Sequence, residues 1–204
     1  IDEIYSHFNP ITIEGIDEAE ENYNSLKPQY VINKIFEAFK GSYFLADAGT
    51  HTTWSSLLSH NDSFGKFLFS GGFAPMGYSL CGSLGVAVAH GDEKVVVVCG
   101  DGDVQMVIQE LATIREYDLN ISIFILNNSQ LGVIRQWEET IYDFDRYQVD
   151  LKNPDFVKIA EADDIGAMAV KSREDLMVAI EESLKDGAYL VDVAVAEENI
   201  PMPN

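Results

Sequence analysis

The amino-acid sequence predicts an α/β fold: a doubly wound, mostly parallel sheet with helices on both faces. Two observations lead to this prediction. From Pro28 onward, segments with a helical spacing of apolar residues alternate with short apolar runs of strand length. The run at residues 95–99 is apolar at every position, as expected of a strand that is covered on both faces. This alternation favours parallel pairing, because each helix returns the chain to the start of the next strand.

The first 27 residues differ in character from the rest of the chain. They are acidic and only weakly periodic, so we expect residues 1–27 to be a linker or the tail of a preceding domain. Residues 28–204 are expected to form a C-terminal domain. The chain starts with Ile1 and lacks the pattern of a signal peptide. We therefore expect it to be part of a longer polypeptide.

Helices and strands alternate through the first half of the expected domain. Apolar residues from Tyr30 to Phe39 form a stripe that predicts a helix, and Pro28 suits its first turn. Small apolar residues at 77–89 predict a buried helix. The expected strands are residues 43–46, 67–69 and 94–99, and a further helix is expected at 52–59.

The second half continues the alternation. A helix at 103–116 would rise about 21 Å and a strand at 121–126 about 20 Å, so the chain returns to the level at which it left the sheet. Residues 142–153 are polar and aromatic without periodicity, which predicts a loop that covers a site. Further helices are expected at 130–139, at 154–162 with Pro154 in the first turn, and at 173–185, and further strands at 167–170 and 189–195.

Composition argues against several kinds of partner. A net charge of −21 and only 13 Lys and Arg residues argue against nucleic acid, whose phosphates attract clustered basic side chains. No apolar stretch of the sequence is long enough to cross a membrane. Cys81 and Cys99 stand in apolar segments without metal-site spacing. We interpret them as buried free thiols in a reducing compartment, the cytoplasm.

Two polar signatures end neighbouring apolar runs. Gly100-Asp101-Gly102 follows the run at 94–99, and Asn127-Asn128 follows the run at 121–126. In a parallel sheet both signatures lie at the carboxyl edge, where open α/β sheets bind ligands. The glycines allow a tight turn into a helix whose first N–H groups can bind phosphate. Carboxylate and amide oxygens suit a hard divalent cation such as Mg²⁺, so the pair predicts a metal bridge to a diphosphate.

Other stretches form a pattern together with these two signatures. They are Asp47-Ala48-Gly49-Thr50-His51-Thr52-Thr53-Trp54, Ser70-Gly71-Gly72-Phe73-Ala74-Pro75-Met76-Gly77-Tyr78, Gln109-Glu110-Leu111-Ala112-Thr113, Leu131-Gly132-Val133-Ile134-Arg135-Gln136-Trp137, Asn153-Pro154-Asp155-Phe156-Val157-Lys158 and Glu197-Glu198-Asn199. The pattern resembles the thiamine-diphosphate-binding C-terminal domain of thiamine-dependent enzymes, and more narrowly the large subunit of acetolactate synthase.

The resemblance implies a site for thiamine diphosphate and Mg²⁺. Asp101, Asn128 and the backbone carbonyl of Gln130 would bind the metal. Met76 would hold the cofactor in its bent form, and the Ala74 carbonyl would accept a hydrogen bond from its aminopyrimidine. The expected cofactor-binding residues are Ala48, Gly49, Thr50, His51, Ala74, Met76, Gly100, Asp101, Gly102, Asp103, Asn128, Leu131 and Gly132.

The implied activity is that of a carboligase of branched-chain amino acid biosynthesis, which decarboxylates pyruvate and joins the two-carbon unit to a second 2-oxo acid. Met76, Val133 and Trp137 would form the substrate pocket. In the family, a glutamate on the N-terminal domain of a neighbouring subunit forms the ylid, so we expect no catalytic residue for that step here and no activity from this chain alone. The N-terminal and middle domains or a partner subunit would complete the site. FAD would bind only to the full-length enzyme, a homodimer or tetramer.

Alternatives remain for the protein and for single residues. A related thiamine-dependent 2-oxo acid decarboxylase or oxidase, and a non-catalytic regulatory relative, would carry similar motifs. The segment around Trp137 favours acetolactate synthase. Met76 could instead be a core methionine, His51 a surface loop residue, and Trp137 an aromatic anchor for its helix.

Four positions depart from the family pattern. Asp103 stands where a small residue usually follows Gly-Asp-Gly, and its carboxylate would either repel a diphosphate or cap the helix. Thr50 replaces the usual Gln, and Ala74-Pro75 replaces a Gly-Thr pair. These differences affect the diphosphate and pyrimidine contacts and leave the metal ligands intact.

Overall fold

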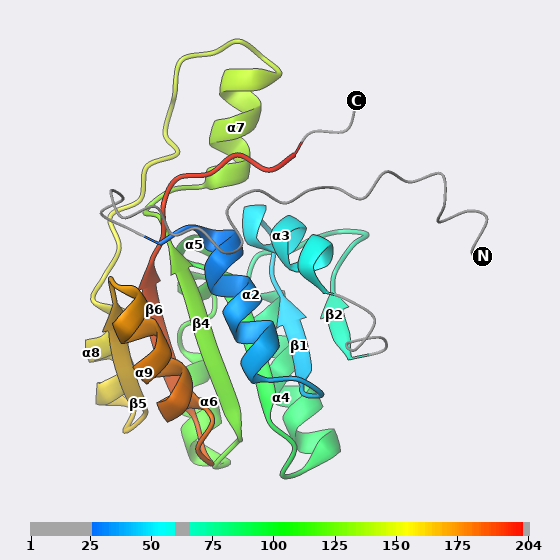
Figure 1. Ribbon diagram of the computed structural model, residues 1–204, viewed down its shortest axis with the longest axis vertical. Helices are drawn as coiled ribbons and strands as arrows, with labels where there is room; N and C mark the ends of the chain where they lie inside the picture. The colour runs from blue at the N-terminus through cyan, green and yellow to red at the C-terminus, as the bar shows by residue number, and fades with distance from the viewer. Residues whose placement is uncertain (1–25, 60–65, 202–204) are drawn as a thin grey trace, which may run out of the picture.

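The computed structural model describes residues 26–59 and 66–201, and the linker expected at the start of the chain lies almost wholly outside them. Leu26, the first described residue, is already buried and pairs with Val195. The described chain forms a six-stranded sheet in which neighbouring strands are parallel (Figure 1). Its order is β2 (Phe67–Phe69), β1 (Tyr43–Ala46), β3 (Val95–Gly100), β4 (Ile121–Asn127), β6 (Tyr189–Ala194) and β5 (Gly166–Val170).

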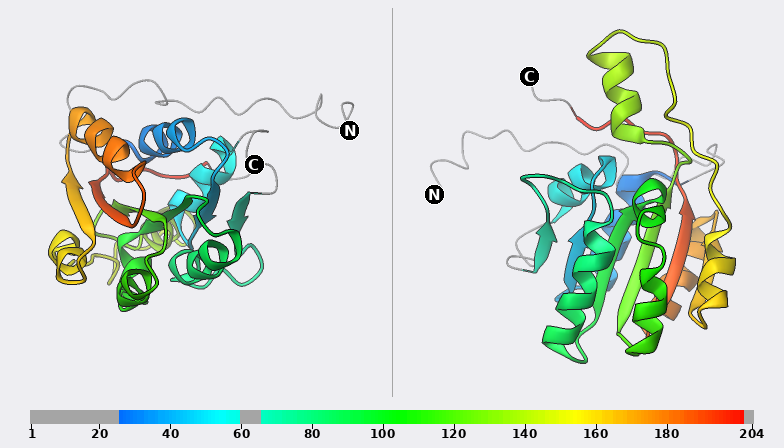
Figure 2. Two further views of the ribbon diagram at one scale, coloured as in Figure 1. Left: turned by 90° about the horizontal axis from the view of Figure 1, so that it is seen from below. Right: turned by 180° about the vertical axis from the view of Figure 1, so that it is seen from behind.

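Helices cover both faces of this sheet (Figure 2), which confirms the expected doubly wound α/β fold. One face carries α2 (Pro28–Ala38), α3 (Thr50–Leu58) and α9 (Arg173–Ser183), and the other carries α4 (Tyr78–His90), α5 (Asp101–Gln105), α6 (Glu110–Glu116) and α8 (Phe156–Ala162). α7 (Gly132–Thr140) stands beyond the carboxyl ends of the strands. Among the described helices, none has both the length and the apolar character that a membrane crossing requires.

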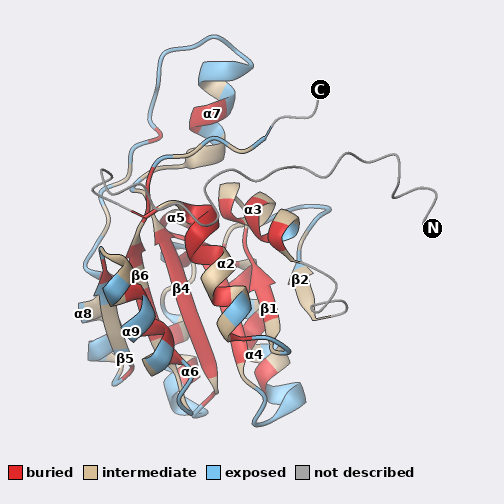
Figure 3. Ribbon diagram, in the orientation of Figure 1, coloured by how far each residue is buried: buried red, intermediate tan, exposed pale blue. Residues whose placement is uncertain are grey.

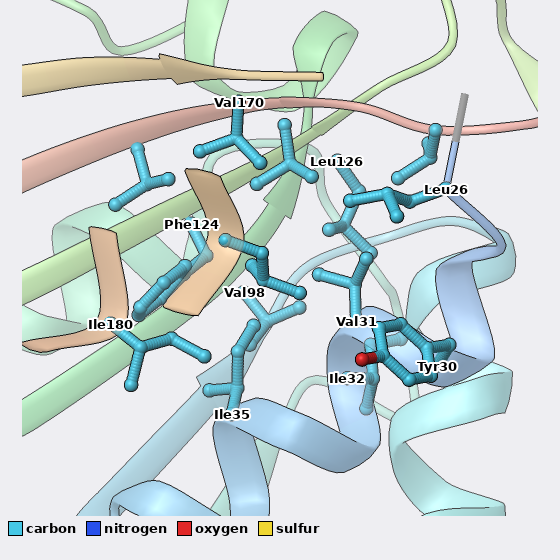
Figure 4. Packing of buried hydrophobic residues seen from close by; sticks show 14 of the residues in the cluster. Leu26, Tyr30, Val31, Ile32, Ile35, Val98, Phe124, Leu126, Val170 and Ile180 are labelled. Carbon is cyan, nitrogen blue, oxygen red and sulfur yellow. The ribbon is translucent and has the colours of Figure 1, made fainter. Parts of the chain in front are cut away.

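Alternating side chains of the central strands build a core on each face of the sheet. Val96 and Val98 join Phe124 in the core under α2 and α9 (Figure 4), whereas Val95 and Val97 belong to the core on the opposite face. All of β3 is buried. β4 is buried except for its last residue (Figure 3). Both central strands are therefore covered on two sides, as their uninterrupted apolar sequences predict.

The strand order creates a break beside the central pair of strands. The chain runs outward from β1 to β2 and then crosses to the other side of β1 to form β3. In the sheet register, Ala46 is paired with Val98 and Gly100 with Leu126. The residues that follow β1, β3 and β4 therefore meet at one edge, at the position where α/β sheets bind ligands.

The prediction of one continuous helix at 103–116 is wrong, because two separate helices, α5 and α6, occupy this segment. Between them, backbone bonds join residues three apart, as from Met106 N–H to the Asp103 carbonyl and from Glu110 N–H to the Val107 carbonyl. Such bonds make a tighter turn than an α-helix. The turn brings Val107 against Gly77, where an added Cβ would lie 2.7 Å from the valine side chain. The break thus accompanies a tertiary contact that helical periodicity does not reveal.

The helix expected to be buried at 77–89 is buried on one side only. α4 packs on the sheet through Leu80 and Ala87, whereas Val88 and Cys81 are exposed. The expectation of two buried thiols is therefore wrong for Cys81 and confirmed for Cys99. The helix itself carries small apolar residues on every side, so the sequence does not show which face is covered.

Two helices begin later than expected. α7 starts two residues late because Gln130 is engaged in an antiparallel bridge with Asp150. α8 does not contain Pro154. It starts after Asp155, whose carboxylate accepts a hydrogen bond from Lys158 N–H and so caps the helix.

Phe124 provides a test of the core beneath α2 and α9. Its side chain is fully buried and lies edge-on to Phe39, with ring centroids 5.7 Å apart. We expect Phe124→Ala to lower the free energy of unfolding by about 3–5 kcal/mol, because it removes buried apolar surface and leaves a cavity. Urea denaturation measures the change.

Phe144→Ala is the matched control, because this phenylalanine is 66% exposed. We expect it to change the free energy of unfolding by no more than about 0.5 kcal/mol. Equal losses in the two variants would contradict the place of Phe124 in the core.

Candidate functional site

A cavity of about 510 Å³ lies at the carboxyl edge of the sheet, beside the ends of β1, β3 and β4. It brings together all of the residues that the sequence marked for cofactor, metal and substrate: Ala48, Gly49, Thr50, His51, Ala74, Met76, Gly100, Asp101, Gly102, Asp103, Asn128, Gln130, Leu131, Gly132, Val133 and Trp137. Residues that are almost ninety positions apart in the chain therefore share one site.

Asp101 is the first residue of α5 and directly follows β3. Its side chain is buried, and burial raises the pKa of the carboxyl group, whereas a hydrogen bond from Asn153 acts in the opposite direction. The next residue, Gly102, lets Met76 and Leu131 approach closely, since an added Cβ would lie 3.1 Å from each. The Gly-Asp-Gly turn thus holds a buried carboxylate at the wall of the cavity.

The chain turns sharply after β4. Ser129 has a φ of 58°, in the left-handed region, and lies between Asn128 and Gln130. The Asn128 side chain closes the turn, because its Oδ1 accepts a hydrogen bond from Gln130 N–H at 3.1 Å. Through this turn Asn128 and Gln130 line the cavity that Asp101 also lines.

The corner of the cavity formed by Asp101, Asn128 and Gln130 offers oxygen atoms as metal ligands. A carboxylate, an amide oxygen and a backbone carbonyl are the ligand types that a hard divalent cation takes. Within residues 26–59 and 66–201, no group of three or more His, Cys, Asp and Glu side chains is arranged to hold a metal ion. A cation beside Asp101 would therefore need oxygen atoms from a bound ligand or from water to complete its coordination.

Asp47 holds the start of α4 in place, a role that the sequence did not indicate. Its carboxylate accepts hydrogen bonds from Gly77 N–H at 2.8 Å, from Ser79 N–H at 3.1 Å and from the Ser79 hydroxyl at 2.7 Å. It thus caps a helix that starts about 30 residues later in the chain. Its position directly after β1 was the available signal, because polar residues at strand ends of parallel sheets face ligand sites.

The segment before α4 carries a strained residue. Ala74 has a φ of 49°, a left-handed conformation that costs an L-amino acid about 1–2 kcal/mol. This is the position at which the family pattern has glycine. Its N–H donates to the Ser70 carbonyl at 3.0 Å, which holds the turn closed. Strain of this kind is common where a backbone is shaped around a ligand.

His51 and Asp103 are in contact beneath the cavity, with 3.4 Å between His51 Nε2 and Asp103 Oδ2. His51 is only 5% exposed, so a surface role for it is wrong. Asp103 Oδ2 also accepts a hydrogen bond from Gly100 N–H at 2.8 Å and so caps α5 from within its first turn. Burial lowers the pKa of His51 to about 4. Burial, and then the charge of Asp47, raise the pKa of Asp103 to about 8.

These two pKa values mean that the folded pair binds one proton between about pH 4 and pH 8. In the unfolded chain the two groups have their ordinary pKa values, 6.5 for His51 and 3.8 for Asp103. Together they bind one proton between pH 3.8 and pH 6.5 and none above pH 6.5. The folded state therefore holds one proton more than the unfolded state between about pH 6.5 and pH 8. The contribution of this pair to stability therefore falls as the pH rises through that range.

The inner side of α7 forms the outer wall of the cavity through Val133, Ile134 and Trp137. Trp137 is 40% exposed. The anchoring contacts of the helix lie on its other side. Two buried residues, Arg135 and Gln136, hold the C-terminal segment there.

Those anchoring contacts are short and directional. Arg135 Nη2 donates to Asn199 Oδ1 at 2.6 Å, and Arg135 Nη1 lies 3.1 Å from Glu197 Oε1. The Gln136 amide makes two hydrogen bonds to the backbone of Ile200, at 2.8 and 2.9 Å. The position of the cavity's outer wall therefore depends on the last residues of the described chain.

The charge of the cavity wall is one-sided. Its described lining includes four carboxyl groups, from Asp47, Asp101, Asp103 and Glu198, of which that of Asp103 holds a proton below about pH 8, and the lining contains no Lys or Arg. Glu198 was not assigned from the sequence, because nothing local distinguishes it from the many surface acids of this chain. An anionic ligand would meet repulsion here unless a cation accompanied it.

The shared proton of His51 and Asp103 can be tested through the pH dependence of stability. In Asp103→Asn only His51 titrates, and its lowered pKa makes stability rise between about pH 4 and 6.5 and stay level to pH 8. Wild-type protein should instead lose stability between pH 6.5 and 8. Urea denaturation of both proteins in buffers without divalent cations measures the difference.

Asp118→Asn is the control, since the side chain of this aspartate is 85% exposed and is not among the described residues that line the cavity. It should follow the wild-type curve. Wild-type and Asp103→Asn curves that run parallel between pH 6.5 and 8 would contradict the shared proton.

Residues 47–193 of this chain match the family model of the C-terminal TPP binding domain of thiamine pyrophosphate enzymes. Among curated proteins, the acetolactate synthase large subunit of Cyanidium caldarium is 37% identical over 183 residues, which are 87% of this chain and 31% of that protein. Acetolactate synthase 2, chloroplastic, of Nicotiana tabacum is 36% identical over 190 residues, covering 88% of this chain and 29% of that protein. The chain thus spans about a third of the length of these relatives.

A solved structure, the thiamine diphosphate-dependent 4-hydroxybenzoylformate decarboxylase of Rhodococcus jostii RHA1, superposes with a TM-score of 0.77. It is 23% identical and covers 89% of this chain and 35% of its own, so the likeness shows a shared fold. The family match is more specific. The match runs from the residue after β1 into β6 and includes the ends of β3 and β4, so this chain belongs to the family of C-terminal TPP-binding domains of thiamine pyrophosphate enzymes.

Proposed function

We propose that this chain is the cofactor-binding domain of an acetolactate synthase or a closely related carboligase, and that it binds thiamine diphosphate together with Mg²⁺. The observation that carries the proposal is the single cavity lined by every residue that the family pattern marks for cofactor, metal and substrate. Identities of 36–37% to proteins named acetolactate synthase support the choice of activity.

The charge of the cavity supports a metal ion. A diphosphate is strongly anionic, and the described lining offers it no Lys or Arg. α5 has only five residues, so its dipole contributes little. A divalent cation held by Asp101, Asn128 and the Gln130 carbonyl would supply the missing attraction, and diphosphate oxygens would complete its coordination.

When bound, thiamine diphosphate supplies the chemistry that decarboxylates a 2-oxo acid and transfers the two-carbon unit. The residues of this chain would hold and shield it. Met76 packs beside Gly102 and would support the bent form, while the Ala74 carbonyl would accept from the aminopyrimidine. Val133 and Trp137 would contact the second 2-oxo acid and keep water from the reacting carbon.

The rest of the enzyme would lie outside this chain. The first of the relatives above is about three times as long, since the match covers 31% of it. We propose that further domains or a partner subunit bring the glutamate that activates the cofactor, that FAD binds to those domains, and that the enzyme is a homodimer or tetramer. The free thiols of Cys81 and Cys99 favour a reducing compartment such as the cytoplasm.

Asp101→Ala tests the metal bridge. We expect Mg²⁺-dependent binding of thiamine diphosphate to weaken by more than the roughly 10- to 100-fold that loss of an outer-shell partner costs, because a direct ligand is removed. Calorimetry with the protein at its full natural length measures the affinity. Asp118→Asn should bind as the wild type does. Unchanged affinity in Asp101→Ala would refute the metal assignment.

Product analysis tests the reaction. The protein at its full natural length, given pyruvate, thiamine diphosphate and Mg²⁺, is expected to form acetolactate, whereas the 204-residue chain alone should form none. Acetaldehyde as the sole product would favour a decarboxylase. Absence of cofactor binding would favour a regulatory relative. Acetolactate from the 204-residue chain alone would disprove the need for further domains.

A further inference from the structure

The Asn153 side chain makes three hydrogen bonds next to the cavity. Its Nδ2 donates to Asp101 Oδ2 at 2.6 Å and to Asn127 Oδ1 at 2.8 Å, and its Oδ1 accepts from Gln105 Nε2 at 3.0 Å. Both hydrogens of the amide are thus used. The orientation of the amide is determined by chemistry, because an ionised carboxylate such as that of Asp101 can only accept.

The next amide in this network is held in the same way. Asn127 Nδ2 donates to Asp192 Oδ1 on β6 at 2.9 Å, which leaves Asn127 Oδ1 free to accept from Asn153. Ser129 N–H donates to the same oxygen at 3.2 Å. A continuous set of hydrogen bonds therefore runs from β6 through the end of β4 to the Asp101 carboxylate after β3.

The partner of Asp101 is neutral, and this matters for a cation. A Lys or Arg in the place of Asn153 would orient the carboxylate but also neutralise it. The amide occupies Oδ2 and leaves the negative charge uncompensated. The hydrogen bond also fixes the torsion of the buried carboxylate, so that the remaining lone pairs keep one direction.

The loop that carries Asn153 is bound to the other half of the oxygen donors as well. Leu131 N–H donates to the Val149 carbonyl at 2.8 Å, and Leu151 N–H donates to the Ser129 carbonyl at 2.7 Å. These two hydrogen bonds hold the loop against the turn that contains Asn128 and Gln130. One loop thus contacts the backbone beside two proposed ligands and the carboxylate of the third.

We propose that Asn153 is a positioning residue for the metal site, which orients Asp101 for a divalent cation and joins it to the turn after β4. The inference rests on the proposed function, because it concerns the same cation. Asn153 does not line the cavity in the described residues and is not a ligand in this proposal. It acts through Asp101.

The test measures the affinity for Mn²⁺, used as a paramagnetic substitute for Mg²⁺. Free Mn²⁺ is counted by electron paramagnetic resonance, in the presence of saturating thiamine diphosphate, with the protein at its full natural length. We expect Asn153→Ala to weaken Mn²⁺ binding roughly 10- to 100-fold, the usual effect of losing an outer-shell partner. The readout does not depend on catalytic activity.

Lys152→Ala is the matched control, because this exposed neighbour belongs to the same loop and makes no contact with the carboxylate of Asp101. It should bind Mn²⁺ as the wild type does. Asn153→Leu keeps most of the volume while removing the donor, and it should weaken binding as Asn153→Ala does. It also serves as the test if the alanine variant does not fold.

The outcomes separate this inference from the proposed function. If wild-type protein binds no Mn²⁺ with thiamine diphosphate, the proposed metal site itself is wrong and the inference with it. If wild type binds and Asp101→Ala does not, but Asn153→Ala and Asn153→Leu bind as tightly as Lys152→Ala, the proposed function stands and the positioning role is refuted.

Discussion

The parallel register of β1, β3 and β4 is the constraint on which the site depends. Because Ala46 is level with Val98 and Gly100 with Leu126, the three strands end within about three residue steps of each other, and the polar residues that follow them line one cavity. Two cores hold this register. A slip of one residue in β3 would move Val96 and Val98 out of the core under α2 and α9. Packing far from the cavity thus sets the distances within it.

Buried carboxylates are the second constraint, and each is satisfied differently. Asp47 accepts backbone and hydroxyl hydrogens at the start of α4, which stabilise its charge locally. Asp103 caps α5 and lies against His51, so a proton is available to it. Asp101 alone among these three has a neutral amide from a distant loop as its side-chain partner. Of the three carboxylates, Asp101 is therefore the one whose charge a bound cation would stabilise most, in agreement with the role proposed for it.

Local patterns of sequence predicted what is local in the structure. Apolar runs located the strands, and strand-end polar residues located the cavity, because both follow from the two-residue period and from parallel pairing. The break between α5 and α6 was missed because it depends on Val107 meeting Gly77. The role of Asn153 was missed for the same reason, because its partner Asp101 is distant in sequence and no periodicity encodes the contact. The exposure of Cys81 was missed because small apolar residues lie on every side of α4.

The outer wall of the cavity is joined by the chain to the corner that contains Asp101. α7 is held on one side by the C-terminal segment, through Arg135 and Gln136, and the loop that follows it returns to the turn after β4 and ends at Asn153. The wall that bears Trp137 and the corner that bears Asp101 are therefore joined by one continuous segment of chain. Because the same segment is hydrogen-bonded at both places, its conformation contributes to the shape of the wall and to that of the corner.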